Sequence, residues 1–222
     1  MTLAQIWNLI VLMLSVTGTT LKIFALTAVF AVPLGVLVAL GRMSKHKFIS
    51  VPVRIYQFIL RGTPLILQLL FIYFGPLFLF KALGLSVSYN RFLACIIAFI
   101  LNYAAYFGEI FRAGILSIPQ GQYEAGKVLG YNKFQTFRYI ILPQVIKRVI
   151  PTMGSEFMVL LKDTALATVI SVEEIFTITN KMVTFYSSVI PFIIAGIFYL
   201  VLNSIIEQGF ARIEKKMDYY KG

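Results

Sequence analysis

Residues 120–143 read QGQYEAGKVLGYNKFQTFRYIILP, a polar, basic segment that lies between long hydrophobic runs. Lysine and arginine beside apolar runs are typical of the cytoplasmic loops of membrane proteins. Small residues occur within the segment at Ala125, Gly126 and Gly130, where another surface can approach the backbone closely. The segment therefore predicts a helix–loop–helix on the cytoplasmic face that contacts a second protein.

The composition of the whole chain predicts a protein of the bilayer. Hydrophobic residues make up 59% of the 222 positions and charged residues 13%, and the mean hydropathy is +0.85, far from that of soluble globular domains. The single cysteine, Cys95, excludes an intramolecular disulfide and a cysteine-based zinc site. The net charge of +11 does not indicate nucleic acid as a partner, because the basic residues cluster beside hydrophobic spans.

Five hydrophobic runs reach the length of about 20 residues that a membrane-spanning helix needs. They lie at about 14–41, 53–80, 92–116, 147–172 and 186–210. The fourth run carries Glu156, Lys162 and Asp163, so a broken or partly re-entrant path is one alternative for it. The chain is otherwise interpreted as a single transmembrane domain, residues 1–222, that begins near Met1 because no basic region of a secretory signal precedes the first run.

The basic residues predict the orientation of these spans, because cytoplasmic loops hold an excess of lysine and arginine. Residues 42–54, residues 112–148 and the tail from Arg212 to Lys221 hold most of the 20 lysines and arginines. The alternate loops hold few: Lys81, Arg91, Lys162 and Lys181. We therefore expect the N-terminus outside and the C-terminus in the cytoplasm.

Motifs for chemistry within the chain are missing. No G-x-x-x-x-G-K-[ST] loop occurs, so the chain is not expected to bind and hydrolyse ATP. The one histidine, His46, lies in a basic loop, and no H-E-x-x-H motif is present, so neither a metal site nor a catalytic residue is predicted. Energy for any transport must come from another protein.

The polar segment also fits the pattern E-A-A-x3-G-x9-I-x-L-P. The matching residues are Glu124, Ala125, Gly126, Gly130, Ile140, Leu142 and Pro143. This resembles the signature of the membrane subunits of bacterial ATP-binding-cassette (ABC) importers. The resemblance implies that a coupling helix at about 120–130 docks on the ATPase subunit and carries its closing motion into the membrane. That role falls on Tyr123, Glu124, Ala125, Gly126 and Gly130.

The local chemistry of this segment gives two further expectations. Gly130 is expected to adopt the left-handed conformation that ends the helix, and Asn132 to cap the next one. At the third motif position this chain has Gly126 where the family usually has alanine. Glycine weakens the helix slightly but leaves docking in place.

Four other stretches resemble permeases of polar amino acid importers. They are residues 61–65 (RGTPL) with Gln68, 109–115 (EIFRAGI), 118–125 (IPQGQYEA) and 161–167 (LKDTALA). The resemblance implies an all-α, type I ABC importer permease in the bacterial inner membrane. It also implies a second permease subunit, identical or a close paralogue, two ATPase subunits that bind ATP and magnesium, and an extracytoplasmic binding protein. No cofactor is expected on this chain itself.

Two acids in the fourth run are candidates for the cargo site, since an ionisable residue inside a span is costly. Glu156 and Asp163 are seven residues apart, about 700° of helix rotation, so both fall on one face about 10 Å apart. Related permeases for neutral or acidic cargo often have an amide at the place of Glu156, which makes arginine, lysine or histidine the expected cargo. The α-carboxylate is then expected to bind Lys162, Thr63, or backbone amides near Gly62 and Ser155.

Alternatives stay open at these charges. Asp163 is equally well explained by pairing with Lys162 or another helix, where it would only fix packing. Glu109 and Arg112, spaced i,i+3, are expected to form a structural or gate-forming ion pair. Other functions are an ion-coupled carrier or channel without an ATPase, with Glu109 and Asp163 as ion sites, or an assembly subunit that recruits a cytoplasmic enzyme. Neither requires the spacing of residues 124–143.

Overall fold

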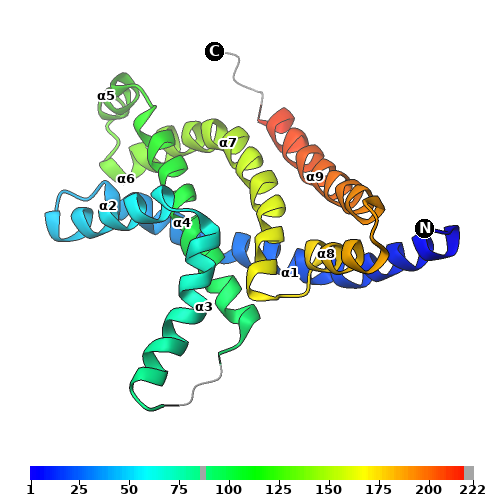
Figure 1. Cartoon of the computed structure of the whole chain (residues 1–222). Coiled ribbons are helices and arrows are strands. Elements are labelled where there is room, and N and C mark those ends of the chain that lie inside the picture. The colour runs from blue at the N-terminus through cyan, green and yellow to red at the C-terminus, as the bar shows by residue number, and fades with distance from the viewer. Residues whose placement is uncertain (86–88, 218–222) are drawn as a thin grey trace.

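The computed structural model describes residues 1–85 and 89–217, and Lys221 of the basic tail lies outside them. The described residues form helices joined by short loops, with no strand among them. Figure 1 shows the elements in order: α1 (Leu3–Arg42), α2 (Lys47–Gly62), α3 (Leu65–Ala82), α4 (Arg91–Leu116), α5 (Gln120–Val128), α6 (Lys133–Thr136), a π-helical turn (Phe137–Ile141), α7 (Leu142–Asp163), a 3-10 helix (Thr164–Ile170), α8 (Ile175–Tyr186) and α9 (Ile190–Lys216).

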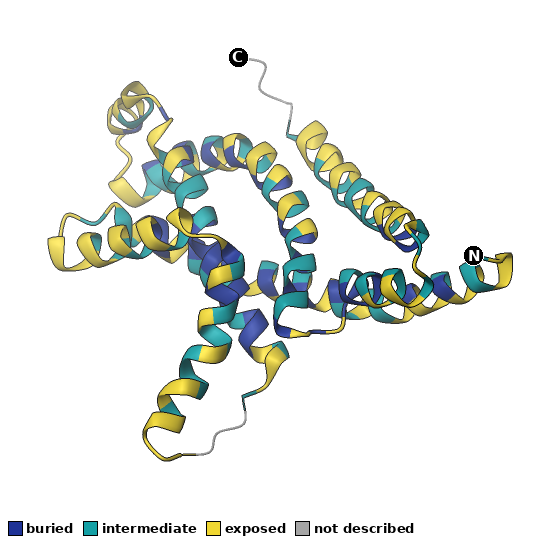
Figure 2. Ribbon diagram, viewed as in Figure 1, coloured by how far each residue is buried: buried dark blue, intermediate teal, exposed yellow. Residues whose placement is uncertain are grey.

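Helix α4 is the centre of the packing. It makes its most extensive contact with α1, and it also packs against α2, α3 and α7. Phe99, Tyr103 and Phe107 of α4 are fully buried, and Figure 2 shows buried residues concentrated along this helix and along α7. Side chains that project from α4 are therefore held by neighbours on several sides.

Two glycines let α1 and α4 cross closely, as small residues do between membrane helices. A Cβ atom on Gly35 would lie 2.7 Å from the Cβ of Phe107, and one on Gly108 would lie 2.5 Å from Cγ1 of Val38. Both distances are shorter than side-chain atoms tolerate. The backbones of the two helices can approach this far only because both positions lack a side chain.

Among the described residues, four helices are long and apolar enough to cross a membrane: α1, α3, α4 and α9. The span predicted at about 53–80 is not one helix, because the run divides at Thr63–Pro64; its bounds stay a prediction. Proline has no amide hydrogen and disfavours the helical conformation of the residue before it, and Thr63 is extended at φ −119° and ψ 147°. Helix α2 therefore ends at Gly62 and α3 starts at Leu65.

The predicted fourth span is interrupted, which was one of the alternatives for it. Helix α7 ends at Asp163, the chain continues as a 3-10 helix to Ile170, and Ser171 then takes a left-handed conformation with φ 58°. Both acids of the fourth run lie before this change of helix type. The count of five spans stays a prediction.

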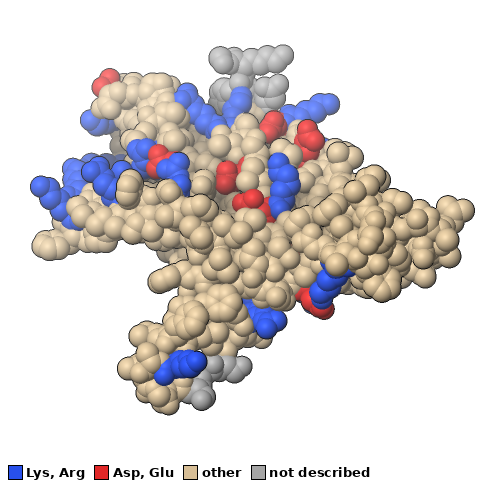
Figure 3. Space-filling model, viewed as in Figure 1, with Lys and Arg blue, Asp and Glu red and all other residues tan. Residues whose placement is uncertain are grey.

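Charges are separated along the molecule. Figure 3 shows most of the visible lysines and arginines on the side where α5 and the C-terminal end of α9 lie, and few around α3. Such a separation is expected when one side of a membrane protein faces the cytoplasm. The placement of the termini on opposite sides of the membrane stays a prediction.

The crossing of α1 and α4 predicts that Gly108→Val lowers the stability of the protein. The added side chain overlaps Val38, and overpacking of this kind costs about 1–3 kcal/mol. Thermal unfolding of the detergent-purified protein, followed by circular dichroism, measures the loss. The matched control is Gly196→Val in α9, where a Cβ meets nothing within 4 Å. Equal unfolding temperatures for the two variants would contradict the close crossing.

Candidate functional site

The break between α2 and α3 is held by two buried amide side chains. The carbonyl of Leu60 accepts hydrogen bonds from Nε2 of Gln68 at 2.9 Å and from Nδ2 of Asn102 at 3.2 Å. Asn102 also donates to Oε1 of Gln68 at 3.0 Å, and Gln68 donates to the carbonyl of Thr63 at 3.1 Å. Away from water, backbone carbonyls freed by a helix break need such partners. The amides therefore fix the shape of the break.

Gly62 and Thr63 lie at this break and are both exposed. A Cβ atom on Gly62 would meet nothing within 4 Å, so its backbone is open to a ligand. The hydroxyl of Thr63 donates to the carbonyl of Ile59 and accepts from Gln68. The sequence predicted Gly62 and Thr63 as site residues but gave no role to Gln68 and Asn102, which position them.

Asp163 is paired with a residue that sequence reasoning missed. The hydroxyl of Tyr103 donates to Oδ2 of Asp163 at 2.6 Å, and the Tyr103 ring stacks on Phe99 with the ring centroids 6.2 Å apart. Within the described residues, no ion pair joins Asp163 to Lys162, whose side chain is exposed. Asp163 therefore contacts another helix, α4, and does not pair with the neighbouring Lys162.

Glu156 lines a cavity of about 510 Å³ between α4 and α7. The polar side chains around this cavity are those of Arg61, Tyr106, Glu109, Ser117, Arg148, Thr152 and Glu156. Asp163 does not line the cavity, but it is near enough to Glu156 to interact with it electrostatically. The cavity is thus lined by the half-buried carboxylate of Glu156 on α7 and by that of Glu109 on α4.

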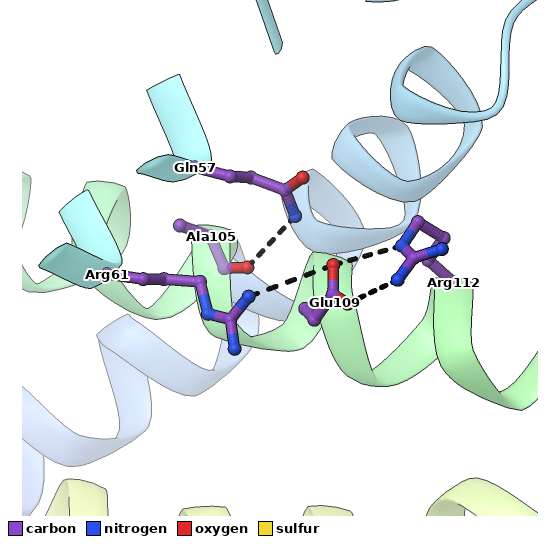
Figure 4. A network of polar contacts seen from close by, with 5 residues as sticks. All are labelled: Gln57, Arg61, Ala105, Glu109 and Arg112. Carbon is purple, nitrogen blue, oxygen red and sulfur yellow. Dashed lines mark hydrogen bonds and ion pairs between the residues drawn. The ribbon is translucent and has the colours of Figure 1, made fainter. Parts of the chain in front are cut away.

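Glu109 lies at the centre of an ionic cluster. Arg112 donates two hydrogen bonds to its carboxylate, from Nε at 3.0 Å and from Nη2, which forms the ion pair that the i,i+3 spacing predicted. Arg61 approaches from α2, with Nη1 3.8 Å from Oε2 of Glu109, as Figure 4 shows. The contribution of Arg61 was not predicted, because its partner is 48 residues away in the sequence.

The segment after α4 ends and restarts its helices as the sequence predicted. Gly130 has φ +74°, and its amide donates to Lys127 while that of Tyr131 donates to Gly126, which is the Schellman arrangement that closes a helix. Asn132 then caps α6, with a capping box to Gln135. Helix α5 is thus a short, sharply bounded element.

The faces of α5 differ from the expectation for Gly126. This glycine is buried, and a Cβ atom on it would lie 2.5 Å from Cγ2 of Thr136, so it allows α5 to pack on α6 and does not face outward. Glu124 and Ala125 are exposed, while Tyr123 packs partly against the core. Apolar side chains beside them are also exposed, notably Val128 at 88% and Phe134 at 74%. Exposed apolar groups among basic residues are typical of a protein contact.

Two hydrogen bonds connect α5 and the end of α4 to α7. Nε2 of Gln144 donates to Oε1 of Gln122 at 2.9 Å, and Arg148 donates to the carbonyl of Ser117. Gln144 and Arg148 lie in the first two turns of α7, the helix that carries Glu156 and Asp163. These two bonds therefore link α5 and the end of α4 directly to the helix with the two acids.

The sequence and the fold are similar to known transport proteins. Residues 31–219 match the family described as "Binding-protein-dependent transport system inner membrane component". The chain is 36% identical to the octopine transport system permease protein OccM of Rhizobium radiobacter, over 95% of this chain and 88% of that protein. It is 34% identical to the histidine/lysine/arginine/ornithine transport system permease protein HisM of Escherichia coli K12, over 89% of this chain and 85% of that protein.

Solved structures share the fold. A crystal structure of an amino acid ABC transporter with histidines matches at a TM-score of 0.86 and 31% identity, covering 97% of this chain and 99% of that one. An inward-facing MetNI methionine ABC transporter matches at a TM-score of 0.74 and 19% identity, covering 98% of this chain and 99% of that one. The second likeness is one of fold alone.

The amide pair at the helix break predicts that Asn102→Leu loosens the junction of α2 and α3. The substitution leaves Oε1 of Gln68 buried without its donor, which costs about 1–3 kcal/mol. Hydrogen exchange of the detergent-purified protein is expected to become faster at residues 60–66. Asn203→Leu is the matched control, since Asn203 donates to the carbonyl of Tyr199 within its own helix. Unchanged exchange at 60–66 in Asn102→Leu would show that the amides do not hold the break.

Proposed function

The chain belongs to the family of binding-protein-dependent transport system inner membrane components and is a permease of an amino acid ABC importer, and from this premise we propose that it carries a basic amino acid by alternating access. It is a multi-pass membrane protein and not an enzyme, because a separate subunit hydrolyses ATP. Importers of this family work with ATPase subunits and a binding protein. The proposed assembly has two ATPases and two permease subunits in the bacterial inner membrane.

Glu156 is the observation that carries the choice of cargo. Its half-buried carboxylate lines the cavity between α4 and α7, and the carboxylate of Asp163 lies within electrostatic reach. Two neighbouring carboxylates attract a cation and disfavour a neutral side chain. Relatives are named for octopine, glutamine and histidine/lysine/arginine/ornithine, and the two acids favour a cationic cargo over glutamine for this chain.

The break at Thr63–Pro64 is proposed to bind the α-carboxylate of the cargo. Thr63 and Pro64 directly precede α3, whose first turn favours a negative group through the helix dipole. Gly62, the last residue of α2, has an open backbone beside them. Ser155 and Lys162 are exposed and each directly precedes one of the two acids, so they complete the proposed set. A zwitterionic cargo would thereby be held between α7 and the break.

Helix α5 is proposed to be the coupling helix. Glu124 and Ala125 present an exposed surface to the ATPase subunit, with Tyr123 beside them, while Gly126 and Gly130 shape the segment from inside. Closure of two ATPases would draw the α5 helices of two permease subunits together, and the bond between Gln122 and Gln144 would pass that motion to α7. Alternating access then requires only a helix bundle with two arrangements. The Glu109–Arg112 pair is proposed as part of the inner gate.

Glu156→Gln is expected to lower the affinity for arginine, lysine and histidine at least about tenfold, because it removes one charge of the cation site at nearly constant size. Equilibrium binding of the labelled amino acids, and of glutamine, to the purified complex with its ATPase measures this. Glu207→Gln makes the same change at an exposed position of α9 and is expected to leave binding unchanged. If glutamine binds equally well to wild type and Glu156→Gln, the acids are structural and the cargo is neutral.

Glu124→Lys is expected to abolish ATPase activity that depends on cargo, because it reverses a charge on the exposed face of α5 that docks on the partner. Steady-state ATP hydrolysis by the reconstituted complex measures the loss. Glu214→Lys, an equal charge reversal at the exposed end of α9, serves as the control. Full stimulated hydrolysis in Glu124→Lys would contradict the coupling role, and uptake by the chain without any ATPase would instead support the ion-coupled carrier.

A further inference from the structure

Arg61 projects from the last turn of α2 into the cavity that Glu156 lines. Figure 4 shows its guanidinium directed toward Glu109 on α4. The centre of the guanidinium lies 5.5 Å from the centroid of the Tyr106 ring, over its face. Arg61 also interacts electrostatically with Glu156 across the cavity. A positive group of this chain therefore occupies the space between Glu109 and Glu156.

The contacts of Arg61 are loose. Its ion pair with Glu109 is 3.8 Å long, its side chain is 41% exposed, and it forms no hydrogen bond with the described residues. Glu109 does not depend on it, because Arg112 already donates two hydrogen bonds to the same carboxylate. Arg148, on another wall of the cavity, differs in that it is fixed by its bond to the carbonyl of Ser117. Arg61 can therefore leave its place at small cost.

The surroundings of Arg61 are those that recognise a guanidinium in general. An aromatic face binds a cation, arginine more often than lysine, and a carboxylate at its edge adds directional attraction. Tyr106 supplies the face and Glu109 the carboxylate, one turn apart on α4. The cavity runs on to Ser117 at the end of α4, close to the start of α5.

We propose that Tyr106 and Glu109 form a second cation subsite for the cargo and that the Arg61 side chain occupies this subsite when no cargo is there. A basic amino acid that moves from Glu156 toward the end of α4 displaces Arg61 with its cationic side chain. This inference rests on the proposed function, since it requires a cationic cargo. After release of the cargo, Arg61 returns to Tyr106 and competes with rebinding. A guanidinium cargo stacks on the ring better than an ammonium, so this subsite favours arginine over lysine.

Arg61→Gln tests the competition in the purified complex with its ATPase. The variant is expected to bind labelled arginine about three- to tenfold more tightly. The reason is that the state with Arg61 in the subsite loses one loose cation–π contact and one partly exposed ion pair. Arg148→Gln removes the same charge from the same cavity and is the matched control, with a smaller gain expected. Adding Tyr106→Leu to Arg61→Gln is expected to cancel the gain for arginine and to affect lysine less.

Several results would overturn the inference. Arginine binding that is unchanged or weaker in Arg61→Gln, or a gain equal to that in Arg148→Gln, excludes displacement of Arg61. Arg61→Lys, which keeps the charge but stacks less well, provides a second variant should Arg61→Gln not fold, and its expected gain is smaller but present. Failure of the wild-type complex to bind any basic amino acid is a different result, because it rejects the proposed cargo itself. Normal wild-type binding with no gain in either Arg61 variant rejects only the occupation of the subsite by Arg61.

Discussion

The site depends on how one interruption of the backbone is satisfied away from water. Pro64 ends α2 and frees carbonyls that have no partner within the helix, and in an apolar environment each would cost several kcal/mol if left alone. Gln68 and Asn102 supply the donors, from α3 and α4. Helices α2, α3 and α4 are thereby joined at the point where Gly62 and Thr63 are open. The hydrogen bonds that satisfy the freed carbonyls therefore also fix the orientation of the break.

Helix α4 links the packing of the protein to its chemistry. Its Gly108 allows α1 to approach closely. Along the same helix, Asn102 hydrogen-bonds to Gln68 at the break, Tyr103 to Asp163, and Glu109 to Arg112. Because these side chains project from one rigid element, their spacing is fixed by helix geometry. A change in the tilt of α4 relative to α7 would alter both the cavity between them and the bond from Tyr103 of α4 to Asp163 of α7.

Local features of the sequence predicted local structure well. The helical class, the end of α5 at Gly130, the cap at Asn132 and the pair of Glu109 with Arg112 all depend on residues within a few positions of one another. The span predicted at 53–80 contains two helices, α2 and α3, because Pro64 interrupts the hydrophobic run. Contacts between distant residues carried no signal in a single sequence: Tyr103 with Asp163 is 60 residues apart, and Arg61 with Glu109 is 48 apart.

The packing of Gly126 on Thr136 has an evolutionary consequence. An alanine at position 126 would place a methyl group only 2.5 Å from Cγ2 of Thr136. The two positions should therefore vary together across the family, with a smaller residue opposite each alanine, since residues in contact constrain one another's size. The glycine at position 126 and the threonine ten residues later in the chain thus form one packing unit.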